Sequence, residues 1–293
     1  MSRFRRRSAR PVPNDTTTGT PGPGATPVTI GLSTYAFFWR RSERVSRPLD
    51  LLAVIERTAA AGAGVLQICD LPGLERLSAT ELAALRAASE QAGVALEVGF
   101  RGVRSASLER FLDIAVALRA RLVRTMLGAG ADRPTVQEAV RELRAVAPRY
   151  ADAGVRIGLE TYEVFATSDL LRVVTGVGDP GIGVCLDPAN TVARLEQPHA
   201  TIDQVAEHVV NLHVKDFTFT RSPGLVGFAL TGCELGTGLL DLGYLYDRVR
   251  PSERGISEIV EHWLPWQGDE VTTVETEERW TERSLAVMRG LAG

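Results

Sequence analysis

Lysine is almost absent from this chain of 293 residues. Lys215 is the only lysine among 33 basic residues, and all the others are arginine. Lysine carries a compact charge and can lose its proton when desolvated, whereas arginine stays charged. Because this exception lies in HVVNLHVKDF (208–217), a run typical of a buried strand, we treat Lys215 as a candidate functional residue.

Long apolar runs and paired cysteines are also lacking. No segment approaches the roughly 20 apolar residues that span a bilayer, so we expect no membrane partner. The three cysteines, Cys69, Cys185 and Cys233, form no C-x-x-C pair, and we expect reduced thiols in a cytoplasmic protein. No G-x-G-x-x-G follows the first predicted strand and no G-x-x-x-x-G-K-[ST] occurs, so the usual nucleotide-binding signatures are missing.

Residues 1–27 differ from the rest in composition. They are rich in Arg, Pro, Gly and Thr, with almost nothing to bury, and we predict a disordered tail. The tail carries a charge of +4; since the whole chain has a net charge of −3, the remainder carries −7. An acidic body argues against nucleic acid as a partner.

From residue 28 onward, short runs rich in Val, Ile and Leu alternate with stretches of helical periodicity. Eight such units of about 33 residues predict a single-domain (β/α)₈ TIM barrel over 28–293, with a doubly wound open sheet as the alternative. Several helical stretches end in Ala-Gly, where glycine favours a left-handed cap. The predicted strands are 28–33, 64–69, 94–100, 121–127, 154–160, 181–187, 209–214 and 255–261.

The last four predicted strands each bring one metal-ligand type of side chain to their carboxyl ends. These are Glu160, Asp187, His213 and Glu261. Glu258 faces the opposite way from Glu261 because side chains alternate along a strand, and Glu261 is nearer the C-terminal end. Residues at this end of a barrel meet above its axis. Three carboxylates there would repel one another unless a cation neutralised them.

This ligand set predicts a divalent metal ion. Carboxylate oxygens and one imidazole suit Mn²⁺, which we expect, and also Mg²⁺, Co²⁺ or Fe²⁺. Zn²⁺ is a further alternative.

Five segments resemble the xylose isomerase-like barrels of the sugar phosphate isomerase/epimerase superfamily: GLETYE, GVCLDPANT, VVNLHVKDF, GTGLLDL and IVEHW. The resemblance extends from about residue 28 to the end of the chain. It implies that strand five supplies Glu160, that an LD-x-x-N turn supplies Asp187 and Asn190, and that the last strand supplies Glu261. An H-x-K-D motif adds His213, Lys215 and Asp216.

The family resemblance implies an isomerase or epimerase that acts on a keto-sugar through a metal-stabilised enediolate. Glu160 and Glu261 would then take and return a proton on opposite faces of the substrate. Lys215 would polarise a substrate oxygen, or would pair with Asp216 as a structural ion pair.

A longer stretch, HVKDFTFTRSPGLVGFALTGCELGTGLLDL, together with EHWLPW, resembles a branch of the family that includes the decarboxylase of 3-oxo-isoapionate. The alternative function is therefore a metal-dependent decarboxylase or lyase of an oxo-sugar acid. On that resemblance, Lys215, Asp216 and Arg221 face the substrate, and Arg221 seats its carboxylate.

Other residues are predicted to line the substrate site. Tyr162 stands where many relatives have histidine, and Gln67, Asp70 and Arg124 are polar candidates on strands two and four. The aromatic run TYAFFW (34–39) and Trp263 with Trp266 form an apolar wall over a sugar ring, or pack the loops or an oligomer contact.

Two other classes of function remain as alternatives. A DNA-repair endonuclease shares this barrel but would need a basic groove and more than the four histidines present. A non-catalytic accessory barrel would not need an intact ligand set. We expect a small-molecule sugar or sugar acid as the partner, with a homo-oligomer as an open possibility.

Overall fold

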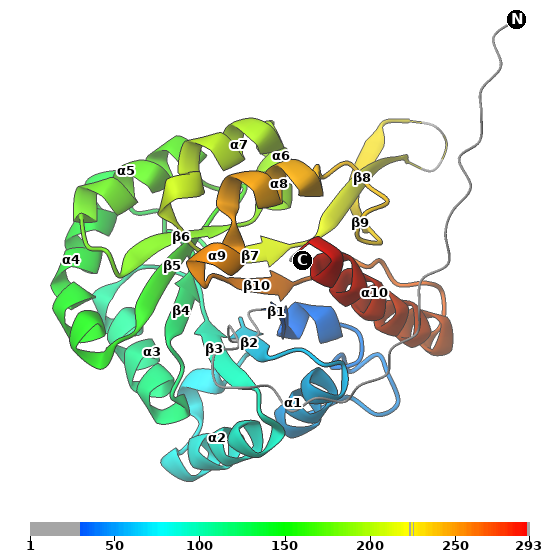
Figure 1. Ribbon diagram of the computed structural model, residues 1–293, viewed down its shortest axis with the longest axis horizontal. Coiled ribbons are helices and arrows are strands. Elements are labelled where there is room, and N and C mark those ends of the chain that lie inside the picture. Colours follow the sequence, from blue (N-terminus) through cyan, green and yellow to red (C-terminus); the bar gives the residue numbers. More distant parts are fainter. Residues whose placement is uncertain (1–29, 223, 225, 292–293) are drawn as a thin grey trace, which may run out of the picture.

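The computed structural model describes residues 30–222, 224 and 226–291, and the predicted tail at 1–27 lies outside this range. Eight parallel strands form a closed barrel in the order β1-β10-β7-β6-β5-β4-β3-β2, with helices around it (Figure 1). This confirms the TIM barrel, and each predicted strand overlaps one of the eight. Their bounds are β1 Ile30–Ser33, β2 Val65–Cys69, β3 Ala95–Gly99, β4 Leu122–Thr125, β5 Arg156–Glu160, β6 Ile182–Leu186, β7 Val209–Val214 and β10 Ser257–Val260.

The outer layer consists of helices that follow the strands. They are α1 Leu51–Ala60, α2 Ala79–Ala92, α3 Ser105–Leu118, α4 Val136–Ala153, α5 Thr167–Val177, α6 Pro188–Val192, α7 Pro198–Val205, α8 Leu242–Val249, α9 Pro251–Arg254 and α10 Glu270–Leu291. Short 3₁₀ turns add η1 Thr34–Phe37, η2 Leu74–Arg76 and η3 Ala206–His208. The last helix, α10, packs against β1 and β10 (Figure 1). No helix in the described ranges is long and apolar enough to cross a membrane.

Local sequence signals set the ends of these helices. Ser78 and Glu81 form a reciprocal capping box at the start of α2. The predicted Ala-Gly stops are confirmed, because Gly93 ends α2 and Gly154 ends α4 with φ values of 69° and 65°. Only glycine adopts this left-handed conformation without a steric cost.

Strand alternation separates an apolar shell from a polar barrel interior. Outward-facing residues such as Leu66, Val98 and Leu212 are buried beneath the helices. Between them, Gln67 and Glu97 point inward and are hydrogen-bonded at 2.9 Å. The interior therefore holds polar side chains that support the site at the carboxyl end of the strands.

One element departs from the predicted pattern. Strands β8 Asp216–Arg221 and β9 Phe228–Cys233 form an antiparallel ribbon outside the barrel, between β7 and α8 (Figure 1). No strand was predicted at 216–233, although DFTFT (216–220) alternates polar and apolar residues as a strand with one solvent-facing side does. The last barrel strand, β10, is also shorter than predicted. It ends at Val260, so Glu261 lies just beyond it.

Candidate active site

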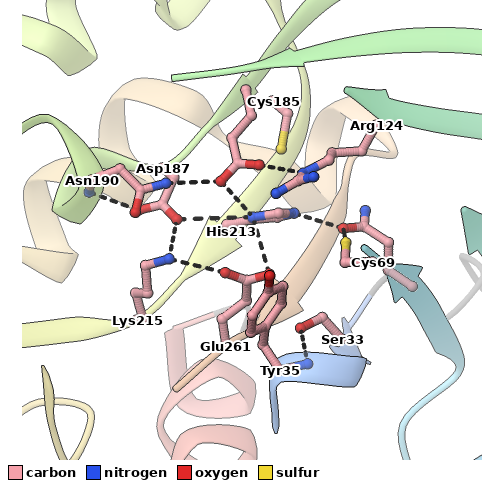
Figure 2. Close-up of polar contacts among 12 residues, drawn as sticks. Ser33, Tyr35, Cys69, Arg124, Cys185, Asp187, Asn190, His213, Lys215 and Glu261 are labelled. Atoms are coloured by element: carbon pink, nitrogen blue, oxygen red, sulfur yellow. Dashed lines mark hydrogen bonds and ion pairs between the residues drawn. The ribbon is translucent and has the colours of Figure 1, made fainter. Parts of the chain in front are cut away.

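The four predicted metal ligands converge at the carboxyl end of the barrel. Glu160 ends β5, Asp187 follows β6, His213 lies in β7, and Glu261 follows β10. One ligand atom from each lies within 4.8 Å of those of the other three, and all four residues are buried. Figure 2 shows Asp187 and Glu261 directed toward His213. Glu258 instead accepts a hydrogen bond from Tyr246 of α8 at 2.6 Å, away from this cluster.

His213 lies at the centre of this cluster. Its Nδ1 atom is 3.5 Å from Glu160 Oε1, 3.5 Å from Glu261 Oε1 and 3.8 Å from Asp187 Oδ2. On the other side of the ring, Nε2 lies 2.7 Å from Gln67 Oε1. An amide oxygen can only accept, so Nε2 carries the proton and the Nδ1 lone pair faces the carboxylates.

Two buried cations balance the carboxylates. The Nζ atom of Lys215 lies 2.6 Å from Asp187 Oδ2 and 2.9 Å from Glu261 Oε2 (Figure 2). The guanidinium of Arg124 forms an ion pair with Glu160 through Nε and a second with Asp70 at 3.1 Å. The Lys215 side chain is 4% exposed and that of Arg124 is 2% exposed. Lys215 therefore does not pair with Asp216, the structural partner considered from the sequence.

The three carboxyl groups are not equivalent. Burial alone would raise the pKa of each of them. Against burial, the guanidinium of Arg124 holds the pKa of Glu160 below its usual value, and the ammonium of Lys215 lowers the pKa of Glu261. For Asp187 burial outweighs the attraction of Lys215, and its pKa is raised. Both glutamates are therefore held as carboxylates.

This donor set fits a divalent metal ion. Two buried ligand atoms, His213 Nδ1 and Glu261 Oε1, have no hydrogen-bond partner among the described residues, while Glu160 Oε2 and Asp187 Oδ2 contact the cations Arg124 and Lys215. Arg124 and Lys215 neutralise two of the three carboxylates, so one negative charge remains on the cluster. Three carboxylates and one neutral imidazole are ligands that Mn²⁺, Mg²⁺, Fe²⁺, Co²⁺ and Zn²⁺ accept.

A cavity of about 480 Å³ opens above the cluster, and eight of the residues named as candidates from the sequence line it. These are Tyr35, Arg124, Glu160, Tyr162, Asn190, Lys215, Glu261 and Trp263. The amide of Asn190 donates to Glu160 Oε1 at 2.8 Å, and the ring of Trp263 lies 4.6 Å from Lys215 Nζ. The predicted wall of aromatic residues is present in part, as Tyr35 and Trp263.

Three residues predicted to bind substrate lie elsewhere. Gln67 is fully buried behind His213 and outside the cavity lining. Asp216 is buried and accepts four backbone N–H groups, from Phe217 and from the loop at 236–240, at 2.8–3.0 Å. Arg221 lies at the end of β8 with its guanidinium 4.4 Å from the Phe228 ring. This geometry gives Gln67 and Asp216 supporting roles and leaves Arg221 on the ribbon.

Two basic residues that line the cavity were underrated or missed. Arg124 was one polar candidate among several, and Arg101 was not considered. Arg101 comes just after β3. A search for any charged side chain at the strand ends, and not for metal ligands alone, would have found it after strand three. Arg124 lies within β4, so only its side-chain reach to Glu160 reveals its role.

The sequence profile of the xylose isomerase-like TIM barrels matches residues 55–291. The chain belongs to this family. It is also 51% identical to the 3-oxo-isoapionate decarboxylase of Pectobacterium atrosepticum over 256 residues, which cover 87% of this chain and 93% of that protein. A member of this family with so similar an enzyme as its relative is itself an enzyme, and the accessory barrel is set aside.

Solved structures of the same fold have much lower sequence identity. A D-psicose 3-epimerase from Clostridium cellulolyticum H10, crystallised with D-tagatose, has a TM-score of 0.70 at 15% identity and covers 90% of this chain and 99% of its own. A xylose isomerase-like TIM barrel protein from Mycobacterium smegmatis in complex with magnesium has a TM-score of 0.64 at 15% identity, with coverages of 91% and 98%. These likenesses establish the fold.

Proposed function

We propose that the chain is a divalent-metal-dependent decarboxylase of a 3-oxo sugar acid, of the 3-oxo-isoapionate type. The observation that carries this proposal is the ion pairing of both glutamates, Glu160 with Arg124 and Glu261 with Lys215. The 51% identical decarboxylase supports the same reaction. The reaction predicted first from the sequence, isomerisation or epimerisation of a keto-sugar, is less well supported.

The two reactions differ in whether they need a base. An isomerase or epimerase removes a proton from carbon, so one glutamate must become protonated and the other must start as the acid. Here both are stabilised as carboxylates by buried cations, with Asn190 adding a hydrogen bond to Glu160. Decarboxylation needs no base, because the electron pair comes from the breaking carbon–carbon bond.

In a 3-oxo acid the bond between C1 and C2 breaks and CO₂ leaves. Its electron pair moves into the C2–C3 bond and onto the 3-oxo oxygen, giving an enolate, and C2 then takes up one proton while the ketone re-forms. Lys215 holds a proton at Nζ on the cavity wall and is placed to stabilise the developing charge and to return that proton. Trp263 and Tyr162 line the same cavity as Lys215.

Glu160, Asp187, His213 and Glu261 would hold the metal ion, with Mn²⁺ as our first choice and Mg²⁺, Co²⁺, Fe²⁺ and Zn²⁺ as alternatives. A bound divalent ion supplies Lewis-acid stabilisation of negative charge on substrate oxygens. Gln67 keeps the His213 lone pair directed into the ligand cluster, and Arg124 keeps Glu160 ionised.

The test is CO₂ release from 3-oxo-isoapionate by the Mn²⁺-loaded protein in D₂O. We expect one CO₂ per substrate and one deuterium in the product, at the carbon that carried the carboxylate. The His213→Ala variant should bind less metal and release CO₂ more slowly. Epimerisation of a neutral keto-sugar with exchange of its C–H proton, and no CO₂ from the oxo acid, would show that the proposal is wrong and that the isomerase prediction was right.

A further inference from the structure

Arg101 occupies a junction between cavities at the carboxyl end of the barrel. It lines the cavity of about 480 Å³ above the metal-ligand cluster, a neighbouring cavity of about 620 Å³ that also contains Asp70, and a third of about 230 Å³ beside Tyr162. Its side chain is 44% exposed, in contrast to the buried Arg124. Arg101 is therefore a cation that a ligand can reach from solvent.

The Arg101 guanidinium is held in place from one side. Its Nε donates to Asp70 Oδ2 at 3.0 Å and its Nη2 donates to the Tyr35 hydroxyl oxygen at 3.2 Å. The Tyr35 hydroxyl in turn donates to Asp70 Oδ2 at 3.0 Å, and Asp70 Oδ1 accepts from Arg124 at 3.1 Å. Asp70 adopts a φ of 48°, which non-glycine residues rarely adopt and which aspartate tolerates better than most.

The other edge of the guanidinium is open. An arginine has five N–H groups, and the two bonds above use the edge formed by Nε and Nη2. Over the part of the chain that the structure describes, Nη1 has no hydrogen-bond partner. Nη1 and the second N–H of Nη2 therefore present a two-pronged donor, which matches the two oxygens of a carboxylate.

We propose that Arg101 binds the carboxylate of the substrate and selects acids over neutral sugars, with Asp70 and Tyr35 as its positioning residues. This inference rests on the proposed decarboxylase function and names the residue that recognises the acid. Arg124 has its Nε and Nη1 engaged by Glu160 and Asp70, and Arg221 lies outside the cavity lining. Because the Arg101 side chain is partly exposed, CO₂ formed beside it can leave into solvent once the bond has broken.

The experiment compares an acid and a neutral ligand that cannot react. Isoapionate carries the carboxylate but no 3-oxo group, so it cannot lose CO₂ by this route, and erythrulose is a small neutral ketose. Binding of both to the Mn²⁺-loaded protein is measured by calorimetry for the wild type and Arg101→Gln. The matched control is Arg110→Gln, which removes the same charge from the neighbouring cavity, where Arg110 donates to the Glu75 carbonyl at 3.0 Å.

We expect Arg101→Gln to weaken isoapionate binding by at least about tenfold, as lost charge-assisted hydrogen bonds do. Erythrulose binding should stay within about twofold, and Arg110→Gln should leave both affinities unchanged. Tyr35→Phe should weaken acid binding by a smaller factor and leave the ketose unaffected. Such selectivity is not expected from a merely structural defect.

Failure of this inference can be told apart from failure of the proposed function. If the wild type releases CO₂ but Arg101→Gln binds isoapionate as well as the wild type does, the assignment of Arg101 is wrong and the decarboxylase stands. Loss of acid binding in Arg221→Gln instead of Arg101→Gln would return the role to the residue predicted from sequence. If the wild type releases no CO₂ and Arg101→Gln binds isoapionate more weakly than the wild type, Arg101 remains the carboxylate-binding residue and the reaction must be reassigned.

Discussion

Replacement of Lys215 by methionine tests the charge balance of the site. Methionine has a similar length but no charge, so the substitution leaves Asp187 Oδ2 and Glu261 Oε2 without the ammonium that lies 2.6 and 2.9 Å away. Removing one partner of a buried ion pair costs about 3–5 kcal/mol, because the remaining charge stays desolvated. We expect the metal-free protein to lose about this much free energy of unfolding.

A bound divalent ion should reduce that loss. It would place positive charge beside the same two carboxylates and take over part of the role of Lys215. By linkage, any free energy of unfolding that the ion restores to the variant makes metal binding to the variant tighter than to the wild type. Each 1.4 kcal/mol restored corresponds to about tenfold in affinity. We therefore expect Lys215→Met to bind Mn²⁺ more tightly than the wild type while it releases CO₂ more slowly.

The assay is denaturant unfolding of both proteins with a chelator and with excess Mn²⁺, together with a direct metal titration. Arg248→Met is the matched control, since Arg248 pairs with Asp203 at 2.8 Å but both side chains are about half exposed. Solvent screens that pair, so its loss should change stability little. A metal-free Lys215→Met protein as stable as the wild type, with unchanged Mn²⁺ affinity, would refute the proposed charge balance.

Three further predictions concern residues around the site. Gln67→Leu should weaken Mn²⁺ affinity by about 10–100-fold in a metal titration, because His213 loses the acceptor that fixes its proton; unchanged affinity would contradict this. Asp216→Asn should lower the free energy of unfolding by about 1–3 kcal/mol in denaturant titrations and leave the KM for the acid unchanged, since it serves backbone N–H groups. A raised KM at full stability would place Asp216 on the substrate. Burial, together with the charge of Arg40, lowers the pKa of His262 to about 3. Between about pH 3 and 6.5 the unfolded chain therefore binds more protons than the folded one. The free energy of unfolding falls as the pH falls through that range. Between pH 7 and 4.5, the free energy of unfolding of His262→Leu should therefore fall by about 2–3 kcal/mol less than that of the wild type in unfolding titrations. Equal losses in the two proteins would contradict the lowered pKa of His262.

The barrel and its ligand cluster could be predicted because both depend on periodic features. Each parallel strand is a short apolar run, and a ligand at its carboxyl end must point toward the barrel axis. Glu160, Asp187, His213 and Glu261 therefore follow from strand positions alone. The choice between Glu258 and Glu261 also follows from alternation, and Glu258 is directed to Tyr246 of α8.

The roles of the surrounding polar residues could not be predicted in the same way. Asp216 and Arg221 adjoin the H-x-K-D motif, yet the β8–β9 ribbon carries Arg221 away and Asp216 binds the backbone of a loop 20 or more residues later. Such partners depend on how loops return to the barrel, which leaves no period in the sequence. Arg124 was named only as one polar candidate among several, because it lies inside a strand and its contact with Glu160 depends on the reach of its side chain.

The two halves of the barrel mouth divide the chemistry between them. Strands β5, β6, β7 and β10 supply the metal ligands, a set that would serve an epimerase as well as a decarboxylase. Strands β2, β3 and β4 lead to Asp70, Arg101 and Arg124, which join the cavity mouth to Glu160 through a continuous chain of ion pairs. Arg124 fixes the charge of a glutamate, and Arg101 presents donors to an acid. Under the proposed function, the ligand cluster is common to both reactions, and the cations around it, Lys215, Arg124 and Arg101, favour decarboxylation of an acid over proton transfer on a neutral sugar.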